Sequence, residues 1–360
     1  HRWLYRALSF LVVSCPCALV VSVPLSFFGG IGGASRKGIL IKGGNYMDAL
    51  AHIDTVVLDK TGTLTQGTFA VEAIHPDELS EKELLHLAAH VEHFSHHPIA
   101  VALQGAYQHV GDGCTTNHVH EVVGKGIVAD VNDHRVAVGN ERMMEMEEVT
   151  LHPCKRCEGH AGTVVHVAID GRYAGHVVIS DQIKADASEA LRALRQLGVK
   201  QTVMLTGDKE AVARQVALQV GIDSYAAELL PADKVERVER LIQQQSQEKG
   251  TLAFVGDGIN DAPVLAGADC GAAMGSGADA AIEAADVVFM TSNVEAIPQA
   301  ISIGKKACTI AWQNVVFALA IKALVMILGL LGFANMWMAV FADSGVAMLC
   351  VLNSIRAMKL

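Results

Sequence analysis

The sequence predicts a parallel α/β domain that is split by an inserted α+β domain and carried on three transmembrane helices. Three observations lead to this fold class. Three apolar runs approach the roughly 20 residues that span a bilayer. Between the first two runs, short β-rich segments alternate with helical periodicity, which is typical of a parallel sheet. A long stretch of different character interrupts that alternation and predicts a second domain.

The composition suits a chain of this mixed kind. Of its 360 residues, 51 % are hydrophobic and 18 % are charged, so the apolar residues are expected to be concentrated in one part. The net charge of −10 argues against a nucleic-acid partner, which would need a basic face. The 8 cysteines are scattered, which favours a reducing compartment over a secreted disulfide framework.

The predicted membrane spans are residues 4–28, 310–333 and 336–352. If each run crosses once, three basic clusters fall on the same side, and the positive-inside rule makes that side cytoplasmic, together with the large middle region. These clusters are Arg36, Lys37 and Lys42; Lys305 and Lys306; and Arg356 and Lys359. A buried core helix is the alternative for the first run, although its length and basic flank favour a membrane.

The β-rich segments each deliver polar side chains to their carboxyl ends. Residues 55–58 lead to Asp59, residues 203–205 lead to Thr206, and residues 252–255 lead to Asp257. Ligands bind beyond the carboxyl ends of parallel strands, so these turns are expected to meet at one site. The predicted domains are 1–34 and 305–360 in the membrane, 35–66 with 176–304 as the α/β domain, and 67–175 as the insertion.

The heptapeptide Asp59-Lys60-Thr61-Gly62-Thr63-Leu64-Thr65 is the most specific signal in the chain. A carboxylate can attack a γ-phosphate and form an acyl phosphate. Phosphoryl transfer needs Mg²⁺ and positive charge around the transferred group. Asp257 and Asp261 can hold Mg²⁺ through oxygen ligands, Lys234 can neutralise the phosphoryl group, and Thr206 can hydrogen-bond it.

These motifs resemble those of the P-type ATPases, whose catalytic domain belongs to the haloacid-dehalogenase superfamily, and the match covers essentially the whole chain. The resemblance implies a haloacid-dehalogenase-like phosphorylation domain that uses ATP and Mg²⁺. The implied catalytic residues are Asp59, Lys60, Thr61, Thr206, Gly207, Asp208 and Lys234, and the implied Mg²⁺ ligands are Asp59, Thr61, Asp257 and Asp261. A soluble phosphatase of the same superfamily is the alternative, but it would place an acid–base Asp where Thr61 stands.

The inserted domain carries a second resemblance. The segment Glu-His-Phe-Ser-His-His-Pro-Ile-Ala, residues 92–100, resembles the Ser-x-His-Pro element of heavy-metal P-type ATPases. If the roles of this element in the family apply here, the resemblance implies that Glu92 and His97 contact adenine. Gly124 and Gly126 would let the backbone approach ATP. The sequence therefore predicts a nucleotide-binding domain.

Two further clusters leave a choice between metal binding and an ordinary surface. One is a helical stripe formed by His86, His90, His93 and His97. The other is formed by His152, Cys154, Cys157 and His160, with the Cys-x-x-Cys spacing of zinc ligands.

The first predicted span contains Cys15-Pro16-Cys17, which resembles the transport motif of heavy-metal pumps. Proline opens the helix backbone there, and two thiols suit Zn²⁺, Cd²⁺, Pb²⁺ or Cu⁺. Lys322 and Asp343 are intramembrane ionisable residues, which are usually functional. With Asp343-Ser344-Gly345 they resemble the zinc/cadmium/lead subgroup. The alternative is a Cu⁺ pump, which Met326, Met336, Met338 and Met348 keep open.

The resemblance as a whole implies ATP-driven export of Zn²⁺, Cd²⁺ or Pb²⁺ across the cell membrane, through phosphorylated Asp59. A non-catalytic metal-binding membrane protein is disfavoured by the intact set of carboxylates and Lys234. The family also has an actuator domain with a Thr-Gly-Glu motif and earlier transmembrane helices, neither of which occurs in the sequence. We therefore expect a truncated chain whose partners are those missing parts, membrane lipid, ATP and the metal.

Overall fold

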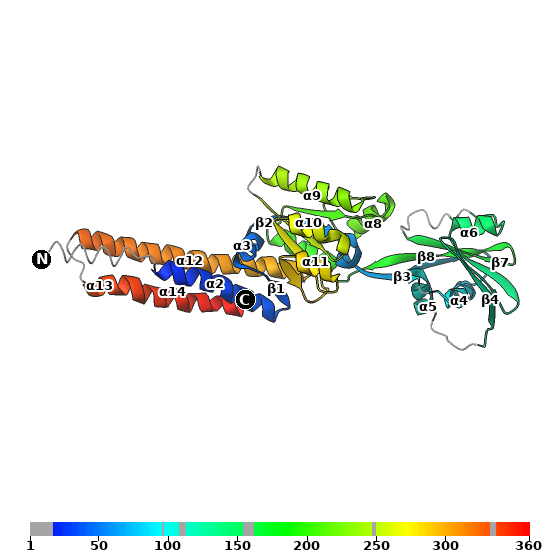
Figure 1. Cartoon of the computed structure of the whole chain (residues 1–360), viewed down its shortest axis with the longest axis horizontal. Coiled ribbons are helices and arrows are strands. Elements are labelled where there is room, and N and C mark those ends of the chain that lie inside the picture. The colour runs from blue at the N-terminus through cyan, green and yellow to red at the C-terminus, as the bar shows by residue number, and fades with distance from the viewer. Residues whose placement is uncertain are drawn as a thin grey trace. The chain divides into compact units, whose positions relative to one another are not determined.

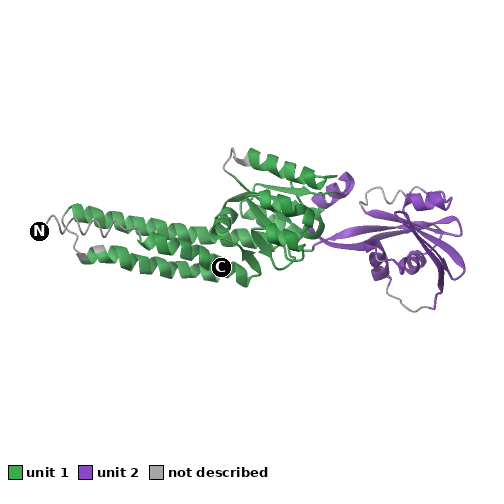
Figure 2. Ribbon diagram, viewed as in Figure 1, with its two compact units in different colours: residues 1–63, 185–207, 219–360 green, residues 64–184, 208–218 purple. Residues whose placement is uncertain are grey.

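The computed structural model describes residues 17–95, 97–107, 113–152, 154, 162–246, 250–331 and 336–360. The chain divides into two compact units, coloured separately in Figure 2. Unit 1 comprises residues 1–63, 185–207 and 219–360, and unit 2 comprises residues 64–184 and 208–218. The insertion predicted at 67–175 thus corresponds to the main segment of unit 2. That segment is longer because the two strands that bound it pair with each other up to Thr65 and Ile183.

The helical part of unit 1 contains two helices that are long and apolar enough to cross a membrane, α2 and α12. The third predicted span is helical but is divided by a π-helical turn, Phe341–Gly345. The elements are α2 (Cys17–Arg36), α12 (Ala296–Leu330), α13 (Met336–Val340), α14 (Val346–Ser354) and a final 3₁₀ turn (Ile355–Lys359).

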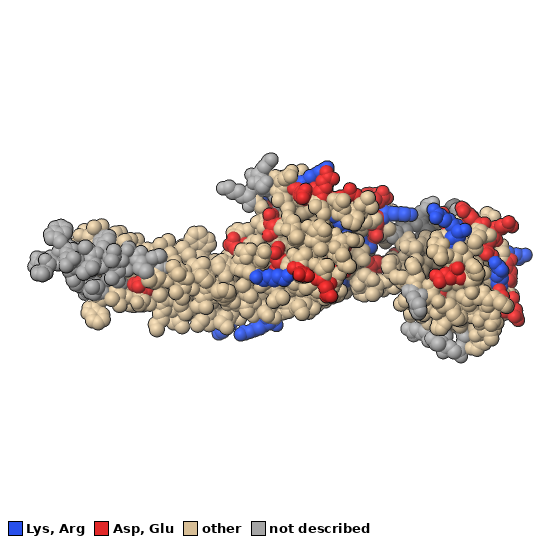
Figure 3. All heavy atoms as spheres, viewed as in Figure 1, with Lys and Arg blue, Asp and Glu red and all other residues tan. Residues whose placement is uncertain are grey.

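These helices pack side by side in Figure 1 and leave much apolar surface uncovered. Trp312, Val316 and Leu324 on α12 are all more than half exposed. On the face drawn in Figure 3, the described surface of the bundle shows few charged atoms, whereas the sheet domain of unit 1 shows many of both signs. This contrast is what lipid on one part and water on the other would favour.

The sheet of unit 1 has seven strands in the order β1-β13-β12-β11-β2-β9-β10, and all pairs are parallel except β1 with β13. The strands are β1 (Ile39–Ile41), β2 (Ile53–Asp59), β9 (Gln201–Leu205), β10 (Ser224–Ala226), β11 (Thr251–Gly256), β12 (Cys270–Met274) and β13 (Val287–Phe289). The helices of unit 1 beside them are α3 (Gly44–His52), α7 (Ala187–Gln196), α9 (Pro231–Ser246), α10 (Ala262–Gly267) and α11 (Asp279–Ala284), whereas most of α8 (Glu210–Val220) belongs to unit 2.

The central strands are buried on both faces, as expected of a parallel sheet between helices. Val57 on β2, Leu205 on β9 and Phe254 on β11 belong to one buried apolar cluster, which also includes residues of α9 and α10. Burial of this kind stabilises by about 25 cal/mol per Å² of apolar surface. The sheet therefore gives a rigid base for the residues at its carboxyl edge.

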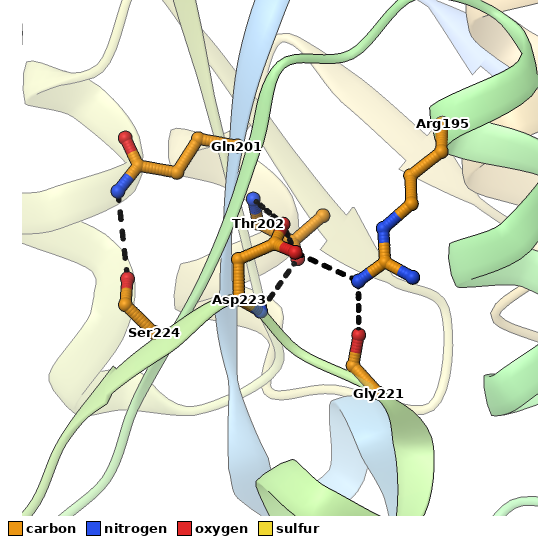
Figure 4. A network of polar contacts seen from close by, with 6 residues as sticks. All are labelled: Arg195, Gln201, Thr202, Gly221, Asp223 and Ser224. Atoms are coloured by element: carbon orange, nitrogen blue, oxygen red, sulfur yellow. Dashed lines mark hydrogen bonds and ion pairs between the residues drawn. The ribbon is translucent and has the colours of Figure 1, made fainter.

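The edge strand β10 is attached to β9 by the polar network of Figure 4. The Asp223 carboxylate accepts hydrogen bonds from the Thr202 backbone N–H (2.9 Å) and hydroxyl (2.7 Å), and from the Arg195 guanidinium (2.8 Å). The guanidinium also donates to the Gly221 carbonyl. One carboxylate thus joins the end of α7 and strand β9 to the residue that precedes β10.

Unit 2 is a six-stranded antiparallel sheet in the order β3-β8-β7-β6-β5-β4, with helices packed on it. Its strands are β3 (Thr65–Pro76), β4 (Thr116–Val122), β5 (Gly126–Val131), β6 (His134–Gly139), β7 (Thr163–Ile169) and β8 (Arg172–Ile183). Its helices are α4 (Glu81–Glu92), α5 (Pro98–Ala106) and α6 (Glu141–Met146). Helix α4 begins with a capping box, in which the Ser80 hydroxyl accepts from Glu83 N–H (3.3 Å) and the Glu83 carboxylate accepts from Ser80 N–H (3.0 Å).

Candidate active site

The candidate active site lies at the carboxyl edge of the unit 1 sheet, where β2, β9 and β11 are neighbours. Strand β2 ends at Asp59, which is opposite Leu205, the last residue of β9. On its other side, Leu58 is opposite Val255, two residues before Asp257. The strand register therefore brings Asp59, Thr206 and Asp257 to one edge, as the sequence predicts. Gly207 and Asp208 continue the turn that follows Thr206.

Lys234 lies against the carboxylate at the centre of this edge. Its Nζ is 2.6 Å from Asp59 Oδ1 and 3.0 Å from Asp261 Oδ1. The lysine comes from the first turn of α9, where Pro231 occupies the first helical position. Burial opposes the charge of Lys234, but the two carboxylates outweigh burial and raise its pKa. Lys234 is thus held as a cation beside Asp59.

Three carboxylates converge at the same point. One oxygen each of Asp59, Asp257 and Asp261 lies within 4.8 Å of the others. Burial, then the neighbouring charge of Asp261, raises the pKa of Asp59 to about 7, although Lys234 acts in the opposite direction. Crowded carboxylates of this kind are the ligands that Mg²⁺ prefers, and a bound divalent cation would relieve their repulsion. The donor set therefore fits Mg²⁺.

The turn after Asp59 depends on glycine. Gly62 has φ +72°, and a Cβ on this residue would lie 1.6 Å from Asp257 Oδ2. Only glycine lets the turn pass so close to the Asp257 carboxylate. Lys60 is buried beside Asp59, whereas the Thr61 side chain is exposed.

The same turn buries the hydroxyl of Thr63. Among the described residues, no hydrogen-bond partner satisfies Thr63 Oγ1, although the atom is fully buried. A buried polar atom without a partner usually costs free energy and calls for an explanation. One explanation fits the chemistry of the neighbouring residues: the hydroxyl would donate a hydrogen bond to an oxyanion that binds at this turn.

Unit 2 carries the predicted nucleotide contacts. Glu92 is the last residue of α4 and is 5 % exposed. Burial, then the charge of Glu121 on β4, raises the pKa of Glu92 to about 7. Helix α4 and strand β4 are in contact. A buried carboxyl with a raised pKa is typical of binding sites.

The remaining nucleotide candidates also have structural roles. His97 caps α5, since its Nδ1 accepts from Ile99 N–H at 3.3 Å. Gly124 has φ +73° in the turn before β5, and its carbonyl accepts from Asn140 Nδ2 at 2.9 Å. A Cβ on Gly126 would lie 2.1 Å from the Val138 carbonyl oxygen, so the pairing of β5 with β6 accounts for this glycine without a ligand. Contact of these residues with ATP stays a prediction.

The predicted transport site is described in part. Cys15 lies outside the described residues, and Cys17 is the first residue of α2. Lys322 Nζ is 3.3 Å from Asp343 Oδ1, so the two ionisable residues singled out in the sequence form an ion pair. Ala18, next to Cys17, packs in a cluster with Val346, which follows the π-helical turn that carries Asp343. The beginning of α2 therefore lies beside this turn, a kind of irregularity that is frequent at functional sites.

The predicted Cys154 and Cys157 cluster is only partly visible. His160 and Cys157 lie outside the described residues. The His152 imidazole is 2.8 Å from the Asp77 carboxylate and stacks edge-on with Tyr173. Metal binding by this cluster stays a prediction.

Sequence reasoning missed a polar cluster inside the helical bundle. Asn314 is 2 % exposed, and its Nδ2 donates to Ser354 Oγ (2.9 Å) and to Ser26 Oγ (3.3 Å). Asn353 Nδ2 donates to Asn314 Oδ1 at 2.9 Å. One signal was available, since a polar residue within each apolar helix is expected to find a partner on another. The network joins α2, α12 and α14.

Comparison with known proteins gives one family model and several relatives that match the chain. The family model for haloacid dehalogenase-like hydrolases matches residues 53–269. A zinc-transporting ATPase of Synechocystis sp. is 52 % identical over 99 % of this chain and 49 % of its own length. A cadmium, zinc and cobalt-transporting ATPase of Bacillus subtilis is 51 % identical over 99 % of this chain and 51 % of its own length.

A solved structure is similar over the same extent. The crystal structure of a zinc-transporting PIB-type ATPase in the E2.Pi state has a TM-score of 0.90 and 38 % identity, covering 99 % of this chain and 58 % of that one. The chain spans about half the length of the curated relatives it matches. By the family model that matches residues 53–269, the chain belongs to the haloacid dehalogenase-like hydrolase family, and over nearly its whole length it is similar to metal-transporting ATPases, one of them of the PIB type.

Proposed function

We propose that the chain is the catalytic and C-terminal membrane part of an ATP-driven exporter of soft divalent metal ions, Zn²⁺, Cd²⁺ or Pb²⁺. The observation that carries this proposal is the combination of two sites in one unit. Asp59, Lys234 and Asp261 form a buried phosphoryl-transfer cluster, while Lys322 and Asp343 form a partly buried ion pair among the apolar helices. The relatives in Synechocystis sp. and Bacillus subtilis, a zinc-transporting ATPase and a cadmium, zinc and cobalt-transporting ATPase, favour a cargo of this class.

In the proposed reaction, an Asp59 carboxylate oxygen forms a bond with the γ-phosphorus of ATP as the bond to the ADP oxygen breaks. Lys234 supplies positive charge to the equatorial oxygens, and the turn at Gly62 and Thr63 supplies N–H and hydroxyl donors. Asp59, Asp257 and Asp261 would hold Mg²⁺, which neutralises charge on the phosphates when bound. Glu92, His97, Gly124 and Gly126 would bind the nucleotide.

The aspartyl phosphate is expected to be long-lived. Thr61 stands where a phosphatase of this superfamily would place its acid–base carboxylate, so a water molecule near Asp59 is poorly activated. A stable phosphoenzyme suits a pump that must change conformation before hydrolysis. We infer that hydrolysis depends on the glutamate of an actuator domain supplied by the longer protein. Thr61 and the apolar helices both disfavour a soluble phosphatase.

The proposed cargo site consists of Cys15, Cys17 and Asp343. Two thiolates and one carboxylate suit a soft divalent ion better than Cu⁺, which prefers thiolate and thioether ligands without a carboxylate. Lys322 neutralises Asp343 in the described structure, and metal arriving at the carboxylate would displace the ammonium. This exchange would let Lys322 act as an internal counter-charge when the metal is released.

The proposed orientation has the sheet domain on the cytoplasmic side of the cell membrane. Two contacts of the basic residues predicted to mark that side support this orientation: Arg36 donates to the carbonyl of Met358, which precedes Lys359, at 3.3 Å, and Lys305 donates to the Leu197 carbonyl of the sheet domain. The cytoplasmic ends of membrane helices are typically enriched in Lys and Arg. Lipid would cover the exposed apolar face of α12.

The test is metal-stimulated ATP hydrolysis by the longer pump in membrane vesicles, across Zn²⁺, Cd²⁺, Pb²⁺ and Cu⁺. We expect stimulation by the divalent ions and its loss in Asp343→Ala. Thr309→Ala, a polar change on the outer face of α12, is the control and should keep it. Full stimulation of Asp343→Ala by Zn²⁺ would reject the ligand role, and stimulation by Cu⁺ alone would reject the cargo class.

A further inference from the structure

Unit 2 contains a group of side chains of metal-binding type that is separate from the carboxylate cluster of Asp59 and from the Lys322–Asp343 pair, although it lies close in sequence to Glu92. His86 and His90 are one turn apart on α4, and Cys114 lies in the segment that leads into β4. One ligand atom of each residue lies within 4.8 Å of the others. Of the four histidines in the predicted stripe, His86 and His90 belong to this group. His97 instead caps α5, and the His93 ring contacts Phe94.

The ring of His86 is oriented for a ligand role. The Tyr107 oxygen is 2.6 Å from His86 Nδ1, and Cys114 Sγ is 3.3 Å from His86 Nε2. When Nδ1–H donates to the Tyr107 oxygen, the lone pair of Nε2 faces the sulfur. Ligand histidines in metalloproteins are fixed in this way by a partner on the second nitrogen.

The sulfur of Cys114 is also held in place. Asn132 Nδ2 donates to Cys114 Sγ at 3.1 Å, and Asn132 Oδ1 accepts from the Thr115 backbone N–H at 3.0 Å. These two contacts of Asn132 fix the sulfur relative to the start of β4. The cysteine is half-buried, as are His86 and His90. Access for a cation from solvent is therefore retained.

We propose that His86, His90 and Cys114 bind a soft divalent cation, Zn²⁺ or Cd²⁺, at a site separate from the cargo site of the membrane helices. Two imidazoles and one thiolate match the ligand types of zinc sites, and three protein ligands leave a fourth position for water. The ring centroids of His86 and His90 are 4.5 Å apart, close enough for both nitrogens to reach one ion. Cation binding would link α4, which ends at Glu92, to the segment before β4.

The test is a Cd²⁺ titration of the purified full chain, followed by ultraviolet absorption of the cadmium–thiolate bond. Cys15, Cys17, Cys154 and Cys157 are first replaced by serine, so that neither the cargo site nor the second predicted cluster contributes thiolate. We expect one equivalent of Cd²⁺ to give the absorption band. Cys114→Ser should abolish it, while Cys308→Ser, which changes a half-buried thiol on α12, should leave it unchanged.

Variants on the helix distinguish the ligands from their neighbours. His86→Gln and His90→Gln should each weaken Cd²⁺ binding by at least about tenfold, and Tyr107→Phe by about tenfold through loss of the orienting hydrogen bond. His93→Gln, one residue past the end of α4 and outside the cluster, should bind as tightly as the parent. Because these variants keep Cys114, they test the proposal even if Cys114→Ser fails to fold.

Thermal unfolding gives an independent readout, since a ligand of the folded state raises its stability. Cd²⁺ should raise the melting temperature of the four-serine parent, and the rise should be much smaller in His90→Gln. The proposal is overturned if one equivalent of Cd²⁺ gives no band, or if the band survives in Cys114→Ser. Neither result depends on transport, so the proposed function could fail while this site stands.

Discussion

At the scale of single residues, Gly62 makes the sharpest steric prediction. Gly62→Ala would place a Cβ 1.6 Å from Asp257 Oδ2, at a φ of +72° that L side chains rarely adopt. The turn or the carboxylate must move by more than an ångström, and a displacement of that size can cost about 100-fold in rate. We expect phosphorylation of Asp59 by ATP to fall by about that factor.

The matched control for Gly62 is Gly267→Ala at the end of α10. A Cβ on Gly267 meets no atom within 4 Å, so this variant should phosphorylate at the parent rate. Single-turnover phosphorylation of the longer pump separates the two. Equal rates for both alanine variants would mean that the close contact between Gly62 and Asp257 is not needed for the reaction.

Lys234 makes an electrostatic prediction. Lys234→Met removes the cation that lies 2.6 Å from Asp59 Oδ1 and 3.0 Å from Asp261 Oδ1. The two carboxylates then face each other without a cation, so the pKa of Asp59 should rise further and less of the nucleophile is ionised at neutral pH. We expect phosphorylation to fall by more than about tenfold, since one pKa unit corresponds to that factor.

Arg237→Met is the control for Lys234, because Arg237 lies on the same helix, α9, but is exposed. It should leave the phosphorylation rate unchanged. The pH profile of the single-turnover rate provides the check, since Lys234→Met should need a higher pH for its maximum. An unshifted profile would contradict the electrostatic role.

Glu92 predicts a pH dependence of stability. Its folded pKa of about 7 is above the ordinary value of 4.5, chiefly because of burial. Between these values the folded state binds more protons than the unfolded state, so this contribution is full below pH 4.5 and is lost as the pH rises through 7. Glu92→Gln keeps the shape without the proton, and its unfolding free energy should fall less than that of the parent between pH 5 and 8.

The control for this pH dependence is Glu121→Gln, which removes the smaller influence on Glu92. Its unfolding free energy should show a shallower fall than the parent and a steeper one than Glu92→Gln. Urea unfolding of the full chain at a series of pH values measures all three. If the unfolding free energies of the parent and Glu92→Gln had the same dependence on pH, the pKa of Glu92 would not be raised in the folded state.

At the scale of secondary-structure elements, the polar network of Asn314 determines how α12 packs against α2 and α14. Asn314→Leu would leave the buried hydroxyls of Ser26 and Ser354 with fewer donors. Interhelical hydrogen bonds in membrane proteins contribute about 0.6 kcal/mol on average and up to about 1.7 kcal/mol. We expect Asn314→Leu to lower the unfolding free energy of the helical bundle by about 1–2 kcal/mol.

The neighbouring Gln313→Leu is the control for this packing. Gln313 is exposed on α12 and has only a long contact, 3.4 Å, to Asn353 Nδ2. Unfolding in detergent with an added denaturing detergent should distinguish the two variants. If both lose the same stability, the network contributes nothing beyond a general effect of leucine on α12.

The elements also show where sequence reasoning was sufficient. Strands β2, β9 and β11 end at chemically informative residues, so their meeting at one edge follows from parallel pairing alone. The third predicted span is helical, but its π-helical turn at Asp343 was not foreseen, because an extra residue in a helical turn leaves the apolar pattern nearly unchanged. Lys322 and Asp343 could be singled out from the sequence because ionisable residues among apolar helices are costly and usually functional.

At the scale of the whole molecule, contacts between residues distant in sequence were the hardest to predict. Cys114 joins His86 and His90 only through the fold of unit 2, and no local spacing links it to them. The contact of Gly62 with Asp257 likewise requires the register of β2 and β11. The main segment of unit 2 runs from 64 to 184, beyond the predicted insertion at 67–175, because the strands β3 and β8 pair with each other past Gly67 and Gly175.

Within unit 1, one long helix connects the sheet domain with the apolar bundle. Unit 1 holds both the nucleophile and the proposed cargo site, and its long helix α12 runs from the sheet domain into the apolar bundle. Helix α12 packs on both α2 and α3, which directly precedes the strand that ends at Asp59. A movement of Lys322 when its ion pair with Asp343 breaks could therefore be transmitted to the sheet domain through the continuous helix α12.

The central claim is that metal at the membrane site permits phosphorylation of Asp59. The measurement that tests it most directly is acid-stable phosphoenzyme formed from labelled ATP by the longer pump, with Zn²⁺, Cd²⁺, Pb²⁺ or Cu⁺ added in turn. The account predicts label with the divalent ions and none in Asp59→Asn. Label that persists in Asp59→Asn, or that forms equally without any metal, would contradict it.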